Sequence, residues 1–229
     1  MGTDRVLGVD ACRAGWIGVA LTAGQTTLYF GATIDALVLA AEADGPLAMI
    51  AIDIPIGLPD AGQRQADKLA YLAVGVLRSS VFITPTRRAL DAPTHAAASA
   101  LNRQLAGQGI SVQAFALKPK IHQVDKWVRD RRHVIEVHPE VSFAQLAGAP
   151  LTVRKSTWAG TERRRGLLAD AGITLGSDLG RPAEMAAVDD VLDAAVAAWT
   201  ARRSARGEAQ SRPDPPEVFS DGLHAAIWS

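Results

Sequence analysis

Three short apolar runs of this chain each carry an acidic residue at or near their end, where a carboxylate is costly to bury. The runs are 6–10, 50–53 and 134–138, and their acids are Asp10, Asp53 and Glu136. A fourth acidic segment, 189–193, lies in an alanine-rich stretch with the composition of a buried helix. A carboxylate beside a core must be paired, protonated or bound to a cation. Any fold of this chain must therefore bring these acids to places where their charge is balanced.

The first part of the chain indicates a sheet that begins as an antiparallel meander. Strand-like runs over 6–10, 17–21 and 26–30 are joined by short turns, which favour antiparallel neighbours. A helix is expected over 33–43, with Thr33 as its N-cap. The strand that follows, over 47–54, is apolar on both faces, which is typical of a central strand covered by helices.

The rest of the chain is mostly helical in its pattern. Helices are expected over 62–77, 94–106, 112–130, 158–171 and 182–203, with a strand over 133–138 and a helix that opens at Pro139. Residues 204–217 are polar and carry prolines, which predicts a mobile loop. Residues 218–219 and 226–228 predict a short last strand or a cover for the edge of the sheet.

This order of elements is the layout of the ribonuclease H-like fold. We expect an α/β protein with a mixed central sheet, in which a three-strand antiparallel meander is followed by parallel strands, and helices cover both faces. The helical residues from about 60 to 130 would be an insertion between two strands. We expect residues 1–229 to form a single domain of this kind.

The bulk composition narrows the class of protein. Of 229 residues, 48% are hydrophobic, which is enough for a sizeable core. Lys and Arg number 24, as do Asp and Glu, so the chain has no strong overall electrostatic field to attract nucleic acid. This balance does not exclude a local basic patch on the surface. Cys12 is the only cysteine, which excludes an intrachain disulfide and favours a reducing compartment. Without a signal peptide or a run of about 20 apolar residues, we expect a cytoplasmic protein with no membrane partner.

The acids predict a metal site. Asp10 and Asp53 end strands that, as parallel neighbours, would place both carboxylates at one edge of the sheet. Glu136 and His138 share one face of their strand, and Asp193 lies in the most apolar stretch of the last helix. Oxygen ligands favour Mg²⁺ or Mn²⁺, and one or two such ions would hydrolyse a phosphodiester without an organic cofactor. We therefore expect Asp10, Asp53, Glu136 and Asp193 to be both metal ligands and catalytic residues.

Plainer explanations of the same residues stay open. An aspartate at a strand end is a common turn former or helix N-cap, and for Asp10 taken alone this explanation is as good as a functional one. Asp189 and Asp190, near a helix start, are explained by the helix dipole. His138 fits a hydrogen-bonded core histidine equally well. The arginine run 163–165 is most often a solvated helix face.

Several motifs of the chain resemble a known family. They are Gly8-Val9-Asp10, Asp53-Ile54-Pro55-Ile56-Gly57-Leu58-Pro59, Ser80-Val81-Phe82, Glu136-Val137-His138-Pro139-Glu140 and Asp189-Asp190-Val191-Leu192-Asp193-Ala194. Together, in this order, they make the chain similar to the family called domain of unknown function 429, whose members are predicted to be ribonuclease H-like nucleases. The chain departs from the family pattern at Arg64-Gln65-Ala66-Asp67, where the family has a cysteine before the aspartate and an arginine further on.

The resemblance implies a nuclease and adds side chains to the candidate site. Lys120 and His138 are expected to act in catalysis, with His138 moving a proton. Substrate contacts are expected from Gln113, Lys155 and Arg163. The expected function is a metal-dependent nuclease or phosphodiesterase that acts on nucleic acid or another phosphodiester.

Two functions other than hydrolysis are also compatible with this sequence. One alternative is a non-catalytic module of the same fold that binds nucleic acid or protein. The other is a nucleotide-binding phosphotransferase, which would need two such domains and is disfavoured by a length of 229 residues. The sequence leaves the choice of DNA, RNA or a small phosphodiester open, and the oligomeric state as well, a homodimer included.

Overall fold

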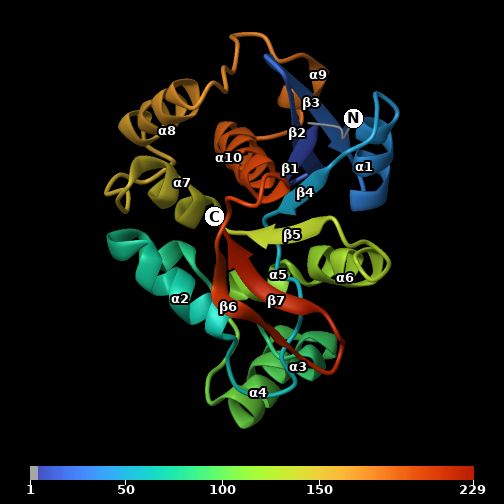
Figure 1. Cartoon of the computed structure of the whole chain (residues 1–229). Helices are drawn as coiled ribbons and strands as arrows, with labels where there is room; N and C mark the ends of the chain where they lie inside the picture. The colour runs from blue at the N-terminus through green and yellow to red at the C-terminus, as the bar shows by residue number, and fades with distance from the viewer. Residues whose placement is uncertain (1–4) are drawn as a thin grey trace.

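The computed structural model describes residues 5–229, which build an α/β protein around one seven-stranded sheet (Figure 1). In order across the sheet, the strands are β3 (Gln25–Gly31), β2 (Gly15–Thr22), β1 (Val6–Cys12), β4 (Met49–Ile52), β5 (Val134–Val137), β7 (His224–Trp228) and β6 (Ser211–Val218). The first three are antiparallel, β1, β4, β5 and β7 run parallel, and β6 pairs antiparallel with β7. This mixed sheet confirms the expected fold class, including the meander that opens it.

Helices cover both faces of the sheet (Figure 1). They are α1 (Ile34–Glu42), α2 (Gln65–Ala73), the short 3-10 helix η1 (Gly75–Ser80), α3 (Arg87–Asp91), α4 (His95–Ala106), α5 (Val112–Ala116), α6 (Lys118–Trp127), α7 (Pro139–Ala147), α8 (Trp158–Asp170), α9 (Arg181–Glu184) and α10 (Val188–Ala205). One core cluster joins α1 and α6 to the sheet, and another joins α7, α8 and α10 to its other face. No described helix is both long and apolar enough to cross a membrane.

The contact between β1 and α10 depends on a glycine. A Cβ on Gly8 would lie 2.0 Å from the Ala198 nitrogen and 2.1 Å from the Ala194 oxygen, so only glycine lets the helix backbone come this close to the strand. Asp10 lies two residues further along β1, and Asp193 lies on the same stretch of α10. The close approach therefore brings these two acids together.

Three expected helices are each divided in two. The stretch expected as one helix over 62–77 forms α2 and η1, and 112–130 forms α5 and α6. Pro119 stands in the first turn of α6, where its missing N–H is tolerated, although it could not continue α5. Likewise, Pro182 opens α9, and α10 begins separately where the Asp190 carboxylate accepts a hydrogen bond from the Ala187 N–H at 3.0 Å.

Residues 211–218 form strand β6, where the sequence predicted a loop. Prolines are compatible with this strand because β6 is at the edge of the sheet, so some of its N–H groups need no partner. The register of β6 against β7 shifts between Arg212 and Glu217, the segment that holds Pro213, Pro215 and Pro216. Both C-terminal strands are therefore members of the sheet, with β7 between β5 and β6 and with β6 at the edge.

Candidate metal centre

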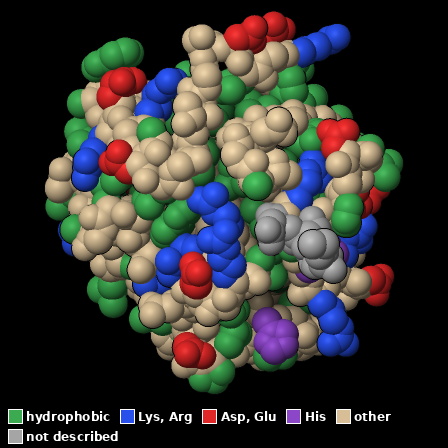
Figure 2. Space-filling view, turned by 45° about the horizontal axis from the view of Figure 1, so that its top comes forward, with side chains coloured by type: hydrophobic (Ala, Val, Ile, Leu, Met, Phe, Trp, Pro, Cys, Tyr) green, Lys and Arg blue, Asp and Glu red, His purple; other side chains and the backbone are tan. Residues whose placement is uncertain are grey.

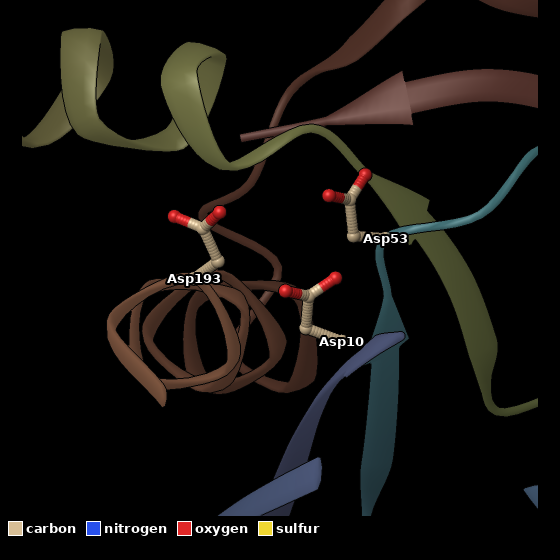
Figure 3. A group of neighbouring side chains, drawn as sticks. All are labelled: Asp10, Asp53 and Asp193. Carbon is tan, nitrogen blue, oxygen red and sulfur yellow. The ribbon is translucent and has the colours of Figure 1, made fainter. Parts of the chain in front are cut away.

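Three aspartates from three different elements converge at one end of the sheet. Asp10 is in β1, Asp53 directly follows β4, and Asp193 is in α10. Each offers a carboxylate oxygen, and these oxygens all lie within 4.8 Å of one another. Figure 3 shows the three carboxylates pointing into a common space. The parallel pairing of β1 with β4, continued by the bond from the Asp53 N–H to the Val9 oxygen at 3.0 Å, places the first two at the same edge.

Burial and mutual repulsion make these carboxylates hard to ionise. Asp10 and Asp193 are 6% and 1% exposed, and Asp53 is half-buried. Burial raises the pKa of Asp53 to about 7, with a further contribution from Glu140. Burial likewise raises the pKa of Asp193 to about 7, reinforced by Asp53, although Lys155 opposes the change. The pKa of Asp10 is raised well above its usual value by burial and then by its two neighbours.

Lys155 is the cation nearest this cluster in the described part of the chain. Its Nζ donates a hydrogen bond to Asp193 Oδ2 and lies 3.5 Å from Asp189 Oδ2. Burial works against the charge of Lys155, but Asp193 and the other acids outweigh it and raise the pKa of the ammonium group. One ammonium group cannot balance three carboxylates. Asp193 Oδ1 is buried without a hydrogen-bond partner among residues 5–229, which leaves a ligand atom for a further cation.

The cluster opens into a cleft of about 330 Å³. Its walls come from the ends of β1 and β4, from the segment after η1, and from α5, α7 and α10. The lining residues that carry polar groups are Asp10, Asp53, Ser80, Gln113, His138, Glu140, Lys155, Asp190 and Asp193. Phe82, Leu117 and two prolines supply an apolar wall. A small substrate could therefore reach the aspartates from solvent.

His138 and Gln113 both line this cleft, as sequence reasoning expected of residues near the site. His138 caps α7, and its Nε2 lies 3.4 Å from the Ser80 carbonyl oxygen, while its Nδ1 has no partner in the described structure. Burial lowers the pKa of His138, so that its ring is neutral at neutral pH. A neutral imidazole at the wall of the cleft can accept a proton.

Glu136, expected as a metal ligand, lies outside the cluster. Its carboxylate is held by the buried Arg64, with Nη2 at 2.5 Å from Oε1 and Nη1 at 3.0 Å from Oε2. The Ile56 N–H donates a further bond of 2.7 Å to Oε2. Arg64 also pairs with Asp67. Both oxygens of Glu136 are therefore committed to the fold, so the structure does not bring this acid to the three aspartates.

Lys120 and Arg163 do not line the cleft either. The Lys120 Nζ donates to the Gly15 oxygen and lies 4.5 Å from the centre of the Trp16 ring. Arg163 is exposed on α8 and does not line the cleft. Its neighbour Arg164 is buried instead, and its Nη2 binds both oxygens of Glu140 at 2.6 and 2.7 Å. The arginine run over 163–165 thus contains one structural arginine, which the sequence pattern did not reveal.

Two features of the site were missed from the sequence. Asp190 lines the cleft as well as bonding to the start of α10, although the sequence favoured the helix dipole as its explanation and made it a weak member of the acidic cluster. Ser80 and Phe82 form part of the wall. The motif Ser80-Val81-Phe82 could have pointed to these two residues, because it belongs to the family pattern and was not needed to predict any strand or helix.

Comparisons with known proteins give one finding. The model of a single family, described as "Protein of unknown function (DUF429)", matches residues 8–218. This stretch includes the three aspartates, His138 and Lys155. No curated protein and no solved structure matches the chain.

Proposed function

The chain belongs to the DUF429 family, and we propose that it is a metal-dependent phosphodiesterase whose ligands for Mg²⁺ or Mn²⁺ are Asp10, Asp53 and Asp193. The observation that carries this proposal is the convergence of the three carboxylates within 4.8 Å in a buried setting. Structural acids of the same chain, such as Glu136 and Glu140, each have an arginine partner. Of the three aspartates, Asp193 alone has a cationic side chain within ion-pair distance among the described residues, Lys155.

The donor set fits an oxygen-loving divalent ion. All three candidate ligands are carboxylates, and no cysteine or histidine belongs to the cluster of described residues, which favours Mg²⁺ or Mn²⁺ over Zn²⁺. Asp193 Oδ1 has no hydrogen-bond partner among residues 5–229. Asp53 and Asp193 have a pKa of about 7, so both can ionise for a metal at neutral pH. A bound ion would activate water and stabilise charge on a phosphoryl oxygen.

The remaining side chains of the cleft have roles that follow from their positions. Lys155 can turn from Asp193 toward the phosphate of a substrate, because a metal ion would take over the charge that it now balances. Neutral His138 can accept a proton from water or return one to the leaving oxygen. Gln113 is exposed on α5 and can orient the substrate at the mouth of the cleft.

The overall charge of the protein gives little attraction for a polyanion. On the face that Figure 2 shows, acidic and basic side chains are interspersed, in keeping with a formal net charge of zero. Nucleases usually hold their substrate through a basic surface. We therefore infer that recognition of the phosphodiester depends mainly on the metal centre and on Lys155. DNA, RNA and small diesters are all candidate substrates.

The test is hydrolysis of bis(p-nitrophenyl) phosphate and of single-stranded, duplex and branched DNA and RNA, with Mg²⁺, Mn²⁺ or EDTA. We expect cleavage of at least one substrate that requires the metal and falls by at least roughly 100-fold in Asp53→Asn. Asp170→Asn, a change at an exposed residue outside the cleft, is the matched control and should keep full activity.

Two results would overturn the proposal. One is cleavage that is unchanged in Asp53→Asn, which would show that the cluster is not catalytic. The other is tight binding of nucleic acid without cleavage and without dependence on metal, which would favour a binding module that keeps the fold.

A further inference from the structure

A second cleft, of about 490 Å³, is lined by residues from the end of α6, from strand β5 and from the β6–β7 hairpin. It is larger than the cleft at the metal centre, and the two share no lining residue. Its volume is within the roughly 300–1,000 Å³ of ordinary small-molecule sites. A ligand could therefore occupy this cleft without contacting the three aspartates of the candidate metal centre.

Three arginines line this cleft, and we call it the arginine cleft. Arg129, Arg131 and Arg132 all come from the segment between α6 and β5. Glu136, the acid in the lining, is already neutralised by Arg64. Arg129 and Arg131 pair with Asp125 and Asp35, so among the described residues the unpaired positive charge of the cleft belongs to Arg132.

The three guanidinium groups differ in how far they are held in place. Arg129 pairs with Asp125 at 3.0 Å. Arg131 pairs with Asp35 at 3.6 Å and donates to the Trp127 oxygen at 2.9 Å, and its guanidinium carbon lies 4.4 Å from the Trp127 ring centre. Arg132 is exposed and forms no side-chain hydrogen bond within the described residues. Two arginines are thus pre-positioned and one is available to a ligand, and the planar guanidinium fork matches phosphate oxygens well.

Much of the remaining lining is apolar. It includes Ile56, Val128, Val134, Leu223 and Trp228. Trp228 also packs against the core cluster of α7, α8 and α10, so aliphatic side chains supply most of the apolar wall. A cleft with arginines on one wall and apolar side chains on another suits a molecule that has both an anionic and a flat apolar end.

We propose that the arginine cleft binds a small organic phosphate of the nucleotide class, with the phosphate at Arg132 and the base against the apolar wall. This site is distinct from the metal centre, and it does not rest on the proposed hydrolysis. Inorganic phosphate alone would lack the apolar contacts, and a nucleoside alone would lack the arginines. Both should therefore bind more weakly than the joined molecule.

The test is calorimetric titration of the full-length protein with adenosine 5′-monophosphate, inorganic phosphate and adenosine in the presence of EDTA. We expect the monophosphate to bind at least roughly 10-fold more tightly than either fragment. Arg132→Gln should weaken its binding by roughly 10-fold or more, because a charge-assisted hydrogen bond is lost. Arg206→Gln, a change at an exposed arginine outside the cleft, is the control and should bind as the wild type does.

Two further variants show which of the two clefts the monophosphate occupies. Arg129→Gln should also weaken binding, and Asp53→Asn should not, because Asp53 belongs to the other cleft. The proposal is overturned if the monophosphate does not bind at millimolar concentration, or if both arginine variants bind it normally. It is also overturned if phosphate alone binds as tightly, or if a single-stranded oligonucleotide binds to the same arginines far more tightly.

Discussion

Buried carboxylates in this protein fall into two groups that differ in how their charge is balanced. Glu136 and Glu140 each accept hydrogen bonds on both oxygens from one buried arginine, Arg64 or Arg164. Of the three clustered aspartates, only Asp193 is paired with a cation among the described residues, the half-buried Lys155. The first group needs no other cation. The second group is short of positive charge, which a metal ion could supply.

Glu136→Gln separates these two groups experimentally. We expect the variant to lose roughly 1–3 kcal/mol of stability, because Arg64 is left with fewer partners. Its affinity for Mn²⁺ should match that of the wild type, since Glu136 is outside the cluster. Denaturant unfolding and calorimetric Mn²⁺ titration measure the two quantities. Asp193→Asn is the positive control and should lose Mn²⁺ binding. A comparable loss in Glu136→Gln would return that residue to the list of ligands.

Lys155→Met tests whether the lysine competes with a metal for Asp193. The variant should bind Mn²⁺ more tightly, because no ammonium group has to be displaced and no like charge remains nearby. Without metal it should be less stable at pH 8 by roughly 1–3 kcal/mol, because a buried carboxylate loses its partner. Lys126→Met, at an exposed position outside the cleft, controls for the loss of one surface charge. Weaker Mn²⁺ binding in Lys155→Met would argue against competition.

At the scale of elements, the site depends on how three segments meet. The parallel pairing of β1 with β4 aligns Asp10 with Asp53, and the approach of α10 to β1 at Gly8 supplies Asp193. The helical segments between β4 and β5 add one wall of the cleft through Ser80, Phe82 and Gln113. The candidate site therefore forms only where β1, β4 and α10 meet, since the three aspartates lie in β1, directly after β4 and in α10.

Gly8→Ala tests this junction. The added Cβ would collide with the backbone of α10, which cannot be relieved by turning a side chain, so the loss of stability should be at least roughly 1–3 kcal/mol. Mn²⁺ affinity should fall as well, since Asp10 and Asp193 would be pushed apart. Thermal unfolding and Mn²⁺ titration provide the readouts. Gly166→Ala, in α8 with no heavy atom within 4 Å of the added Cβ, should be neutral or stabilising. Equal effects of the two changes would refute the role of Gly8.

At the scale of the whole molecule, a neutral chain concentrates opposite charges in separate places. The formal net charge is zero, yet one cleft gathers aspartates and another gathers arginines. The two clefts are lined by different residues. Overall charge therefore says little about either site, and the response of the whole protein to pH is the better measure of the buried acids.

Stability without metal should fall as pH rises from about 4 to about 7. In the folded protein, Asp53, Asp193 and Glu136 each have a pKa of about 7, mainly because they are buried. In the unfolded chain the ordinary values apply, 3.8 for aspartate and 4.5 for glutamate. The folded protein thus binds more protons than the unfolded chain in this window, so each rise in pH favours unfolding. His138, whose pKa is lowered by burial, acts in the opposite sense, but it is one group against three.

Metal binding should follow the opposite trend. Because carboxylate ligands must be ionised, Mn²⁺ affinity and the stabilisation by Mn²⁺ should rise with pH and level off above about 7. Denaturant unfolding at pH 5, 6, 7 and 8, with EDTA and with Mn²⁺, measures both trends. In Asp53→Asn the difference between the two conditions should largely disappear. Stability in EDTA that climbs steadily from pH 5 to pH 8 would contradict the raised pKa values.

The sequence by itself determined most of the strands and helices and the edge at which two acids meet. Apolar periodicity located the strands, Thr33 fixed the start of α1, where its side chain accepts from the Ala36 N–H, and parallel neighbours implied that Asp10 and Asp53 end together. These features are local, or follow from the order of the strands. Burial patterns therefore encode them directly.

Only the tertiary structure decided which charges are paired. Arg64 reaches Glu136 across 72 positions of the chain, and Lys155 reaches Asp193 across 38. It also decided that residues 211–218 join the sheet as an edge strand and that three arginines gather around a cleft. Such pairings depend on distances between segments that are remote in the chain. A pattern of residue types shows that an acid is buried, but its partner is fixed only when the elements pack.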